Sequence, residues 1–345
     1  MTSAARPSAP AAPGPIVDGE EVEVRGPWFE ELHVGQVFDT APAVTLTEGQ
    51  AAVHQSIVSD RLRLPLSQPL ATQVVGNGPI APPGLVWNVA IGQSTVVTQH
   101  VRANLFYRGL VLRRSPLIGD TLSTRTEVVA LKQNRVRPER PATGLAALRI
   151  TTLDQADRPV LDFWRCAMIP LGEPAAVTGH DDDLGAVGRA VTDADLRATV
   201  AGWSLPAATG PAMAAGQRYR VAGRDVVSSA PELARLSLNV AAVHHDAQRA
   251  GGRRLVYGGH TIGVALGQAT RALPGLLTVV AWHSCDHLDP VHEGDLLSST
   301  LDVERVDDLP AGGRLLHLRS LVTAEPTDGG TAVPVLDWRF VAVAA

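Results

Sequence analysis

A group of polar residues near position 240 has the types and spacing needed for proton transfer. Asn239, His244 and Asp246 lie in the segment LSLNVAAVHHD. Histidine suits this chemistry because its unperturbed pKa, about 6.5, lies near neutrality. An amide does not exchange protons near neutral pH, but it can orient a water molecule. The sequence therefore predicts His244 as a general acid/base and Asn239 as the group that positions water.

Gly258 and Gly259 precede an apolar segment with helical spacing. The apolar positions of this segment are Ile262, Ala265, Leu266, Ala269 and Leu273, and Pro274 follows. A backbone N–H at a helix N-terminus can stabilise a developing oxyanion, and glycine allows close approach to a ligand. We predict the Gly258 N–H as that donor.

Each of these residues also has a structural interpretation, and His244 on its own would more often be a surface histidine or one satisfied by local hydrogen bonds. Asn239 is as well suited to capping the local backbone as to positioning water. Asp246 is expected to cap the segment that follows it. Gly258 and Gly259 could form only a turn, and His245 and His260 are expected to be structural or lining residues.

The elements that position these residues occur twice in the chain. Matches recur in the same order at an offset of 175: Gly119-Asp120 with Gly294-Asp295, Pro159 with Pro334, and Gly92-Gln93 with Gly267-Gln268. A fourth match, Gly35-Gln36 with Gly216-Gln217, has an offset of 181. We predict homologous units over 27–172 and 205–345, a polar linker over 173–204, and a disordered Ala/Pro-rich tail over 1–26.

Each unit follows one plan. After Gly119-Asp120, residues 122–128 alternate between inward apolar or Thr side chains and polar ones, which is typical of a half-buried strand. The second unit repeats this pattern at Leu297, Leu301 and Val303. A helix that is apolar on most sides needs burial on most sides, and a long antiparallel sheet wrapped around it supplies that burial. The periodicity predicts an α+β fold, of which several kinds remain open.

Composition excludes several classes of protein. The net charge is −5 and there is no long basic run, so nucleic-acid binding is not expected. Two cysteines, Cys166 and Cys285, do not indicate a disulfide framework and fit a reducing cytoplasm. No apolar stretch approaches membrane-spanning length, and the N-terminal segment lacks the features of a secretory signal. We therefore expect a cytoplasmic protein that binds neither nucleic acid nor membranes.

The segment around His244 resembles the motif of MaoC-like hotdog hydratases. In that family an Asp or Asn is followed five residues later by His, two further on by an acidic residue, and then by a glycine that opens the central helix. Asn239, His244, Asp246 and Gly258 match these positions. The resemblance covers nearly the whole chain outside the tail. It implies a tandem, or double, hotdog fold in which each unit is an antiparallel sheet around a central helix.

The resemblance also implies an activity, that of an (R)-specific enoyl-CoA hydratase. Such an enzyme adds water reversibly to a 2-enoyl-CoA thioester and needs no metal or redox cofactor. His244, Asn239 and Gly258 would be its catalytic residues. Tyr257 and Gly259, together with Asp60 of the first unit, would contact the acyl-CoA substrate. Two hotdog units already form a pseudo-dimer, so both a monomer and a homodimer of chains are compatible with this fold.

Asn239 stands where the commonest pattern has Asp, which leaves other functions open. An Asn here also resembles the mesaconyl/itaconyl-CoA hydratase branch, with the approximate pattern Phe-Asn-x-His-x-Ile-His-Tyr-Asp. Ala241 replaces the first His of that pattern. The alternatives are a hydratase of dicarboxylic thioesters, a hotdog thioesterase, and a non-catalytic acyl-CoA-binding subunit.

The first unit lacks the same chemistry. Asp60 is opposite Asn239, but Pro65 is opposite His244, and Pro82-Pro83-Gly84 replaces Tyr257-Gly258-Gly259. Proline has no N–H to donate. We therefore expect Asp60 to be a structural or ligand-lining carboxylate and the chain to have one productive site.

His283, Cys285 and His287 form a competing constellation. Alternate residues of a regular strand face one side, so these three side chains could bind zinc. Such alternation is a property of any strand, and no paired C-x-x-C accompanies it. We therefore predict no metal site.

Overall fold

The computed structural model describes residues 21–137, 139–206, 213–310, 312–327 and 329–345. Residues 1–20, most of the predicted tail, lie outside the described residues, and residues 21–26 carry no helix or strand. The strands are β1 (Val37–Phe38), β2 (Val44–Thr45), β3 (Ala103–Leu112), β4 (Thr121–Gln133), β5 (Thr143–Leu153), β6 (Pro159–Pro170), β7 (Arg218–Arg220), β8 (Asp225–Val226), β9 (Leu276–His287), β10 (Leu296–Asp308), β11 (Arg314–Glu325) and β12 (Val333–Ala344).

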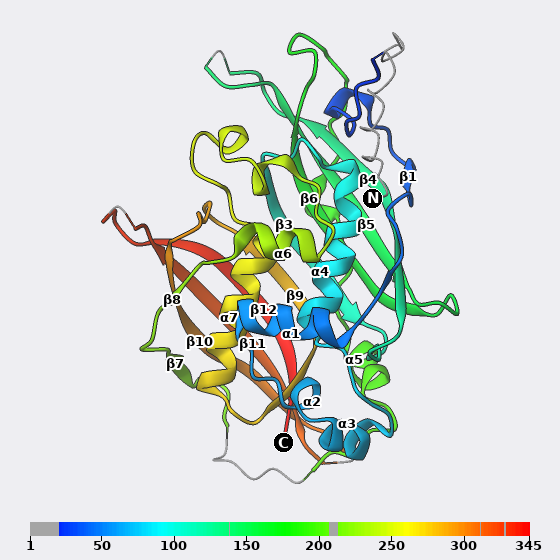
Figure 1. Cartoon of the computed structure of the whole chain (residues 1–345), viewed down its shortest axis with the longest axis vertical. Helices are drawn as coiled ribbons and strands as arrows, with labels where there is room; N and C mark the ends of the chain where they lie inside the picture. The colour runs from blue at the N-terminus through cyan, green and yellow to red at the C-terminus, as the bar shows by residue number, and fades with distance from the viewer. Residues whose placement is uncertain (1–20, 138, 207–212, 311, 328) are drawn as a thin grey trace, which may run out of the picture.

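In the sequence of each half, most of the helices precede the long strands (Figure 1). The α-helices are α1 (Glu48–Val58), α2 (Arg63–Leu66), α3 (Gln68–Val75), α4 (Pro83–Gln93), α5 (Asp193–Thr199), α6 (Ala230–Leu236) and α7 (Gly258–Ala272). The 3₁₀ turns are η1 (Phe29–Glu31), η2 (Ser94–Val97), η3 (Leu184–Ala186), η4 (Ala242–His244) and η5 (Gln248–Ala250).

One antiparallel sheet runs through the whole molecule. Its strand order is β1-β4-β5-β6-β3-β9-β12-β11-β10-β7, with β2 and β8 beside β4 and β10. The order is symmetric about the β3–β9 junction, because the strands of the second half repeat those of the first in reverse. The two halves are therefore related by a pseudo-twofold axis at that junction, as the sequence repeat predicts.

The register at the junction confirms the offset of 175. Phe106 pairs with Asp286, and Val111 pairs with Ala281. Adding 175 to position 106 gives 281, and subtracting 175 from position 286 gives 111, so the second pair is the first pair with the two halves exchanged. Positions that are 175 apart in these strands are therefore structurally equivalent.

The repeated Gly-Asp pair makes the same turn before β4 and β10. Gly119 and Gly294 adopt φ values of 101° and 96°, which favour glycine. The carboxylate of Asp120 accepts a hydrogen bond from the Leu117 N–H at 2.8 Å, and Asp295 accepts one from the His292 N–H at 2.8 Å. The predicted alternation follows in both strands, with every second side chain buried at the start of β4 and of β10.

Two buried helices, α4 and α7, lie on one face of the sheet (Figure 1). Every residue of α4 is buried, and α7 is buried from Gly259 to Thr270. This confirms the predicted apolar helix. α4 packs on β4 and β5, and α7 packs on β10.

Aromatic rings join the two halves. Trp87 of α4 meets Trp282 of β9 with ring centroids 4.9 Å apart, and Trp282 meets Trp338 and Tyr107 at 5.5 and 5.7 Å. These edge-on pairs belong to one continuous hydrophobic core. The halves are therefore held together by packed side chains as well as by the sheet.

The segment predicted as the linker, 173–204, packs against the fold. Leu196, Val200 and Trp203 are buried in a second hydrophobic cluster that also contains Leu64 and Leu277.

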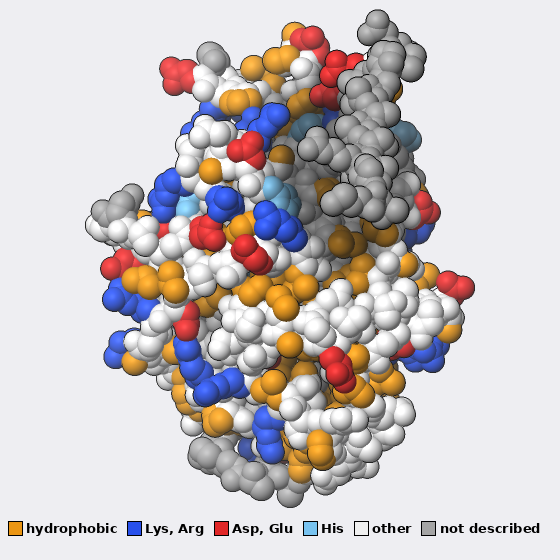
Figure 2. Space-filling model, in the orientation of Figure 1, with side chains coloured by type: hydrophobic (Ala, Val, Ile, Leu, Met, Phe, Trp, Pro, Cys, Tyr) orange, Lys and Arg blue, Asp and Glu red, His pale blue; other side chains and the backbone are white. Residues whose placement is uncertain are grey.

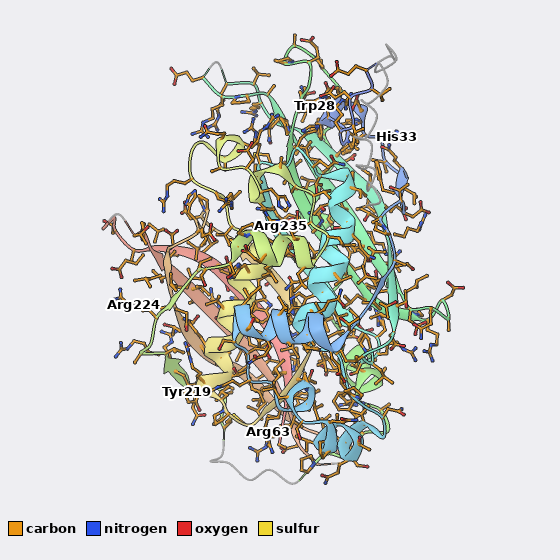
Figure 3. All side chains as sticks on the ribbon, in the orientation of Figure 1. Trp28, His33, Arg63, Tyr219, Arg224 and Arg235 are labelled. Carbon is orange, nitrogen blue, oxygen red and sulfur yellow. The ribbon has the colours of Figure 1, made fainter. Side chains whose placement is uncertain are left out.

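Trp28 and Arg63 mark opposite ends of the molecule in Figure 3. The face in Figure 2 shows basic and acidic side chains interspersed among apolar ones. Within the described residues, no helix is both long and apolar enough to cross a membrane.

Candidate active site

A cavity of about 260 Å³ lies at the seam between the two halves. The second half contributes Asn239, His244, Tyr257 and Gly258, all predicted from the sequence. The first half contributes polar side chains from η2, β3 and β6. The lining polar side chains of the first half are Thr95, Thr98, Asn104, Tyr107 and Arg165, with Arg102 at the rim.

His244 ends the short η4 turn and is buried, with 9% of its surface exposed. Its Nδ1 lies 2.9 Å from the carbonyl oxygen of Leu255. Because a carbonyl only accepts, Nδ1 carries the proton and donates it, so Nε2 of the neutral ring keeps a free lone pair. Burial lowers the pKa of His244 to about 4, with the Leu255 hydrogen bond opposing this shift. His244 is therefore a neutral base at physiological pH.

Asn239 lies at a strained turn after α6. The preceding residue, Leu238, has φ of 60°, an unfavourable conformation for a branched side chain. The Asn239 Oδ1 accepts a hydrogen bond from the Ala241 N–H at 2.9 Å, and its carbonyl oxygen accepts one from Nε2 of His245 at 2.6 Å. The side-chain oxygen is thus a local cap, as one interpretation predicted. Asn239 also lines the cavity, and Nδ2 donates to no other described residue.

The N-terminus of α7 meets the cavity at Gly258. A Cβ atom there would lie 2.6 Å from Cε1 of the His287 ring, so only glycine fits without displacing that ring. Tyr257, the residue before the helix, provides no side-chain cap, and the Gly258 N–H donates to no side chain among the described residues. Its 15 residues direct a positive dipole end toward the cavity.

The other predicted residues divide into neighbours of the cavity and distant ones. Tyr257 lines the cavity, and its ring centroid lies 5.8 Å from that of His244. Gly259 is not a lining residue: a Cβ there would lie 2.2 Å from Oδ1 of Asn88, so this glycine serves packing. Asp246 caps the next segment through the Gln248 N–H at 2.9 Å.

Asp60 does not join the other predicted site residues. It is buried outside this cavity, where one carboxylate oxygen accepts from the Leu62 N–H at 3.3 Å, and burial raises its pKa to about 6. The predicted ligand contact of Asp60 is therefore absent from the cavity around His244, because Asp60 lies after α1 in the first half, as Asn239 lies after α6 in the second.

In the other half, apolar side chains stand at the positions equivalent to several of these site residues. Pro65 lies in α2 beside the buried Leu64, and Pro83 is the first residue of α4. The positions equivalent to Tyr107 and Arg165 are Trp282 and Phe340, both fully buried.

The three residues of the competing zinc constellation do not face one side. The register between β9 and β12 shifts between Trp282 and Ser284, which leaves His283 as a bulged residue. Its Nε2 hydrogen bonds to Nδ1 of His317 at 3.0 Å, whereas Cys285 is in the core and His287 lines the cavity. The expectation of a shared face was wrong because the bulge breaks the alternation. The described residues contain no group of three His, Cys, Asp or Glu side chains arranged to hold a metal ion.

His287 and the first-half residues were not predicted as site residues. Nε2 of His287 is buried without a partner among the described residues, and its ring packs on Tyr107 at 5.8 Å. The available sequence signal was the repeat itself, which aligns the polar Arg165 with the apolar Phe340. Such an asymmetry marks the half that furnishes the polar wall.

The comparisons with known proteins agree with this geometry. No protein-family model matches the chain. The chain is 30% identical over 292 residues to a β-methylmalyl-CoA dehydratase of Chloroflexus aurantiacus, covering 79% of this chain and 80% of that protein. It is 28% identical over 321 residues to a mesaconyl-CoA hydratase of Cereibacter sphaeroides, covering 88% and 91%.

Solved structures show the same architecture. A conserved hypothetical protein of Mycobacterium tuberculosis, described as a double hotdog fold, is 51% identical with a TM-score of 0.84, covering 94% of this chain and 100% of that chain. A putative MaoC domain dehydratase of Chloroflexus aurantiacus is 23% identical with a TM-score of 0.80, covering 94% and 99%, and supports the fold alone. The predicted tandem hotdog fold is confirmed. The chain belongs to the MaoC-like family of double hotdog hydratases and dehydratases.

Proposed function

We propose that this protein is a hydro-lyase that adds water reversibly to the double bond of a 2-enoyl-CoA thioester. One observation carries the proposal: His244 is held as a neutral base, with Nε2 free, in the cavity that receives the N-terminus of α7. Hydration of this bond needs a base, a proton donor and an oxyanion donor, and these groups supply all three.

The reaction proceeds through the side chains in the following way. Asn239 Nδ2 orients a water molecule, and Nε2 of His244 takes one proton as the water oxygen bonds to the β-carbon. Electrons of the double bond move to the thioester oxygen, where the Gly258 N–H stabilises the negative charge. The imidazolium then returns the proton to the α-carbon, so that His244 is regenerated and both parts of water are in the product. In this scheme no metal or redox cofactor takes part.

A hydratase of dicarboxylic thioesters is the second candidate. The two relatives are named for β-methylmalyl-CoA and mesaconyl-CoA, whose acyl groups carry a second carboxyl group. The names of the relatives favour a dicarboxylic acyl group as the substrate. The reaction itself, the addition of water with proton transfer by His244, is the same for both candidates.

A set of thioesters tests the proposed reaction. The purified chain is incubated with crotonyl-CoA and mesaconyl-CoA, and enoyl absorbance and free thiol are followed together. Loss of enoyl absorbance without thiol release supports hydration. Release of thiol would identify a thioesterase, and binding without turnover would identify a non-catalytic acyl-CoA-binding subunit. Activity that survives exhaustive chelation supports the metal-free mechanism, and its loss would contradict it.

We further propose a cytoplasmic location. The thiols of Cys166 and Cys285 are both free and buried, which fits a reducing compartment. A complete cavity within one chain means that a monomer suffices for activity, and a homodimer of chains would carry two such cavities.

A further inference from the structure

Arg165 is a buried cation with only neutral partners. It belongs to β6, lines the cavity and has 3% of its surface exposed. Its Nη2 donates to the carbonyl oxygen of Ser94 at 3.0 Å and to Oγ1 of Thr98 at 2.9 Å. Its Nη1 reaches Oδ1 of Asn104 at 3.5 Å, and Nε has no partner among the described residues. No ion pair links it to a described carboxylate, so its charge is uncompensated.

Other donors around Arg165 are also without acceptors. Nδ2 of Asn104 and the hydroxyl of Tyr257 are buried and have no hydrogen-bond partner among the described residues. Burial raises the pKa of Tyr257 well above its ordinary value, so this hydroxyl keeps its proton and remains a donor. A buried donor without an acceptor is costly, and a buried cation without an anion more so. This part of the cavity is therefore short of acceptors, and the exposed Asp289, a carboxylate that also lines the cavity, makes no ion pair with Arg165.

The fold does not require an arginine at this place. Arg165 pairs across the sheet with Tyr107, and the equivalent pair in the other half is Phe340 with Trp282. Both members of that second pair are fully buried apolar residues. The position equivalent to Arg165 is thus filled by the apolar Phe340, so the fold itself does not need a cation there, which points to a ligand as the reason for Arg165.

The position of Arg165 identifies which part of a thioester could meet it. Arg102, which is exposed, lies at the rim of the cavity and also lines the neighbouring groove that contains Lys132, Arg135, Arg137 and Arg140. Coenzyme A phosphates suit such an exposed basic rim. Arg165 is buried and shares its cavity with His244, so we assign the anion that it binds to the acyl group rather than to coenzyme A.

We propose that Arg165 sets the substrate specificity of this enzyme by binding a carboxylate at the far end of the acyl group, so that the preferred substrates are coenzyme A monothioesters of unsaturated dicarboxylic acids. The guanidinium supplies the counter-charge, and Asn104 and Tyr257 supply further donors. This inference rests on the proposed hydration reaction and adds the residue that selects its substrate.

A matched pair of substrates tests the proposal. Fumaryl-CoA and crotonyl-CoA share a four-carbon enoyl chain and differ in a terminal carboxylate against a methyl group. We expect wild-type kcat/KM to favour fumaryl-CoA by roughly 100-fold, and Arg165→Met to remove most of that preference by lowering only the fumaryl-CoA value. Arg149→Met is the control: this exposed arginine contacts β6 through Asp162, and both values should be unchanged.

Binding of saturated analogues separates this inference from the hydration proposal. Succinyl-CoA should bind more tightly than butyryl-CoA in calorimetry, and Arg165→Met should abolish the difference even if no thioester is hydrated. Arg165→Lys retains the positive charge but lacks the planar guanidinium group, and it should keep part of the preference for the carboxylate. This variant tests the assignment if Arg165→Met folds poorly. A wild-type enzyme without preference for the carboxylate, or equal losses for both members of each pair, would overturn the assignment.

Discussion

The hydrogen bond between His244 Nδ1 and the Leu255 carbonyl fixes which nitrogen can take a proton. A carbonyl cannot donate, so the neutral ring must place its lone pair on Nε2. Removal of this group should therefore remove the base without unfolding the protein. We expect His244→Ala to lower kcat by roughly 100- to 10,000-fold, measured as loss of enoyl absorbance, with an unchanged circular dichroism spectrum.

Asn239→Ala provides the comparison within the same site. Asn239 caps Ala241 through Oδ1, and in the proposed mechanism it only orients water, so its loss should cost less activity than the loss of His244. A greater loss in Asn239→Ala, with an intact fold, would reverse these two roles.

The pH dependence of kcat/KM should report the buried state of His244. Burial lowers its pKa to about 4, so the base form is present above that pH and is lost as the pH falls through it. We expect a constant kcat/KM from pH 8 to pH 5 in assays on stable enzyme and a decline toward pH 4. An inflection near pH 6.5 that disappears in His244→Gln would show that the ring is solvated instead.

At the scale of elements, the start of α7 combines a dipole end with a close side-chain contact. Gly258→Ala retains the N–H but places a methyl group against the His287 ring, at 2.6 Å from Cε1. The helix start or the ring must then move, and displacement of an oxyanion donor should cost roughly 100-fold in kcat.

A double variant tests that steric cause. His287→Ala removes the ring, so Gly258→Ala should cost far less activity in that background. Gly49→Ala is the control, because a Cβ there has only one ordinary contact, at 3.9 Å from Oγ1 of Thr47. Equal losses in both backgrounds would mean that glycine is needed for another reason.

Elements with a local signal could be predicted from the sequence. The turn at Gly119-Asp120 and the alternation after it are encoded within a few residues, as is the apolar periodicity of α7. The bulge at His283 could not be predicted, because it arises from the register with β12. The first-half wall of the cavity was missed for a similar reason: Arg165 and His244 line one cavity only because β3 pairs with β9.

At the scale of the whole molecule, pseudo-symmetry gives the site residues counterparts of a different kind. His244, Gly258 and Arg165 line one cavity, and Pro65, Pro83 and Phe340 stand at the matching positions. We expect titration calorimetry with a saturated acyl-CoA to give one ligand per chain. Two equal tight sites would contradict this assignment, as would hydratase activity that depends on the residues around Pro65.

Buried histidines should make the fold sensitive to acid. Burial lowers the pKa of His54 to about 3 and that of His260 and His287 to about 4. The unfolded chain binds these protons from about pH 6.5 downward, before the folded chain does, so stability is lost as the pH falls from 6.5 toward 4. Asp60, whose raised pKa has the opposite effect, offsets only part of this loss.

Thermal unfolding at a series of pH values measures the effect. We expect the Tm to fall steadily between pH 7 and pH 4.5 and to fall less in His260→Gln, which removes one of these groups from a site where both ring nitrogens have no partner among the described residues. A Tm that is constant over this range would show that the histidines are hydrated in solution.

The symmetric strand order about β3 and β9 has a consequence for how such a protein can be made. His244 comes from one half and Arg165 from the other, so neither half could build this cavity by pairing with a copy of itself. If the two halves were synthesised as separate polypeptides, only a pair of one first half with one second half would contain the complete cavity, and pairs of identical halves would be inactive. Synthesis as a single chain prevents the formation of identical pairs, because both halves are made in equal number and are covalently linked.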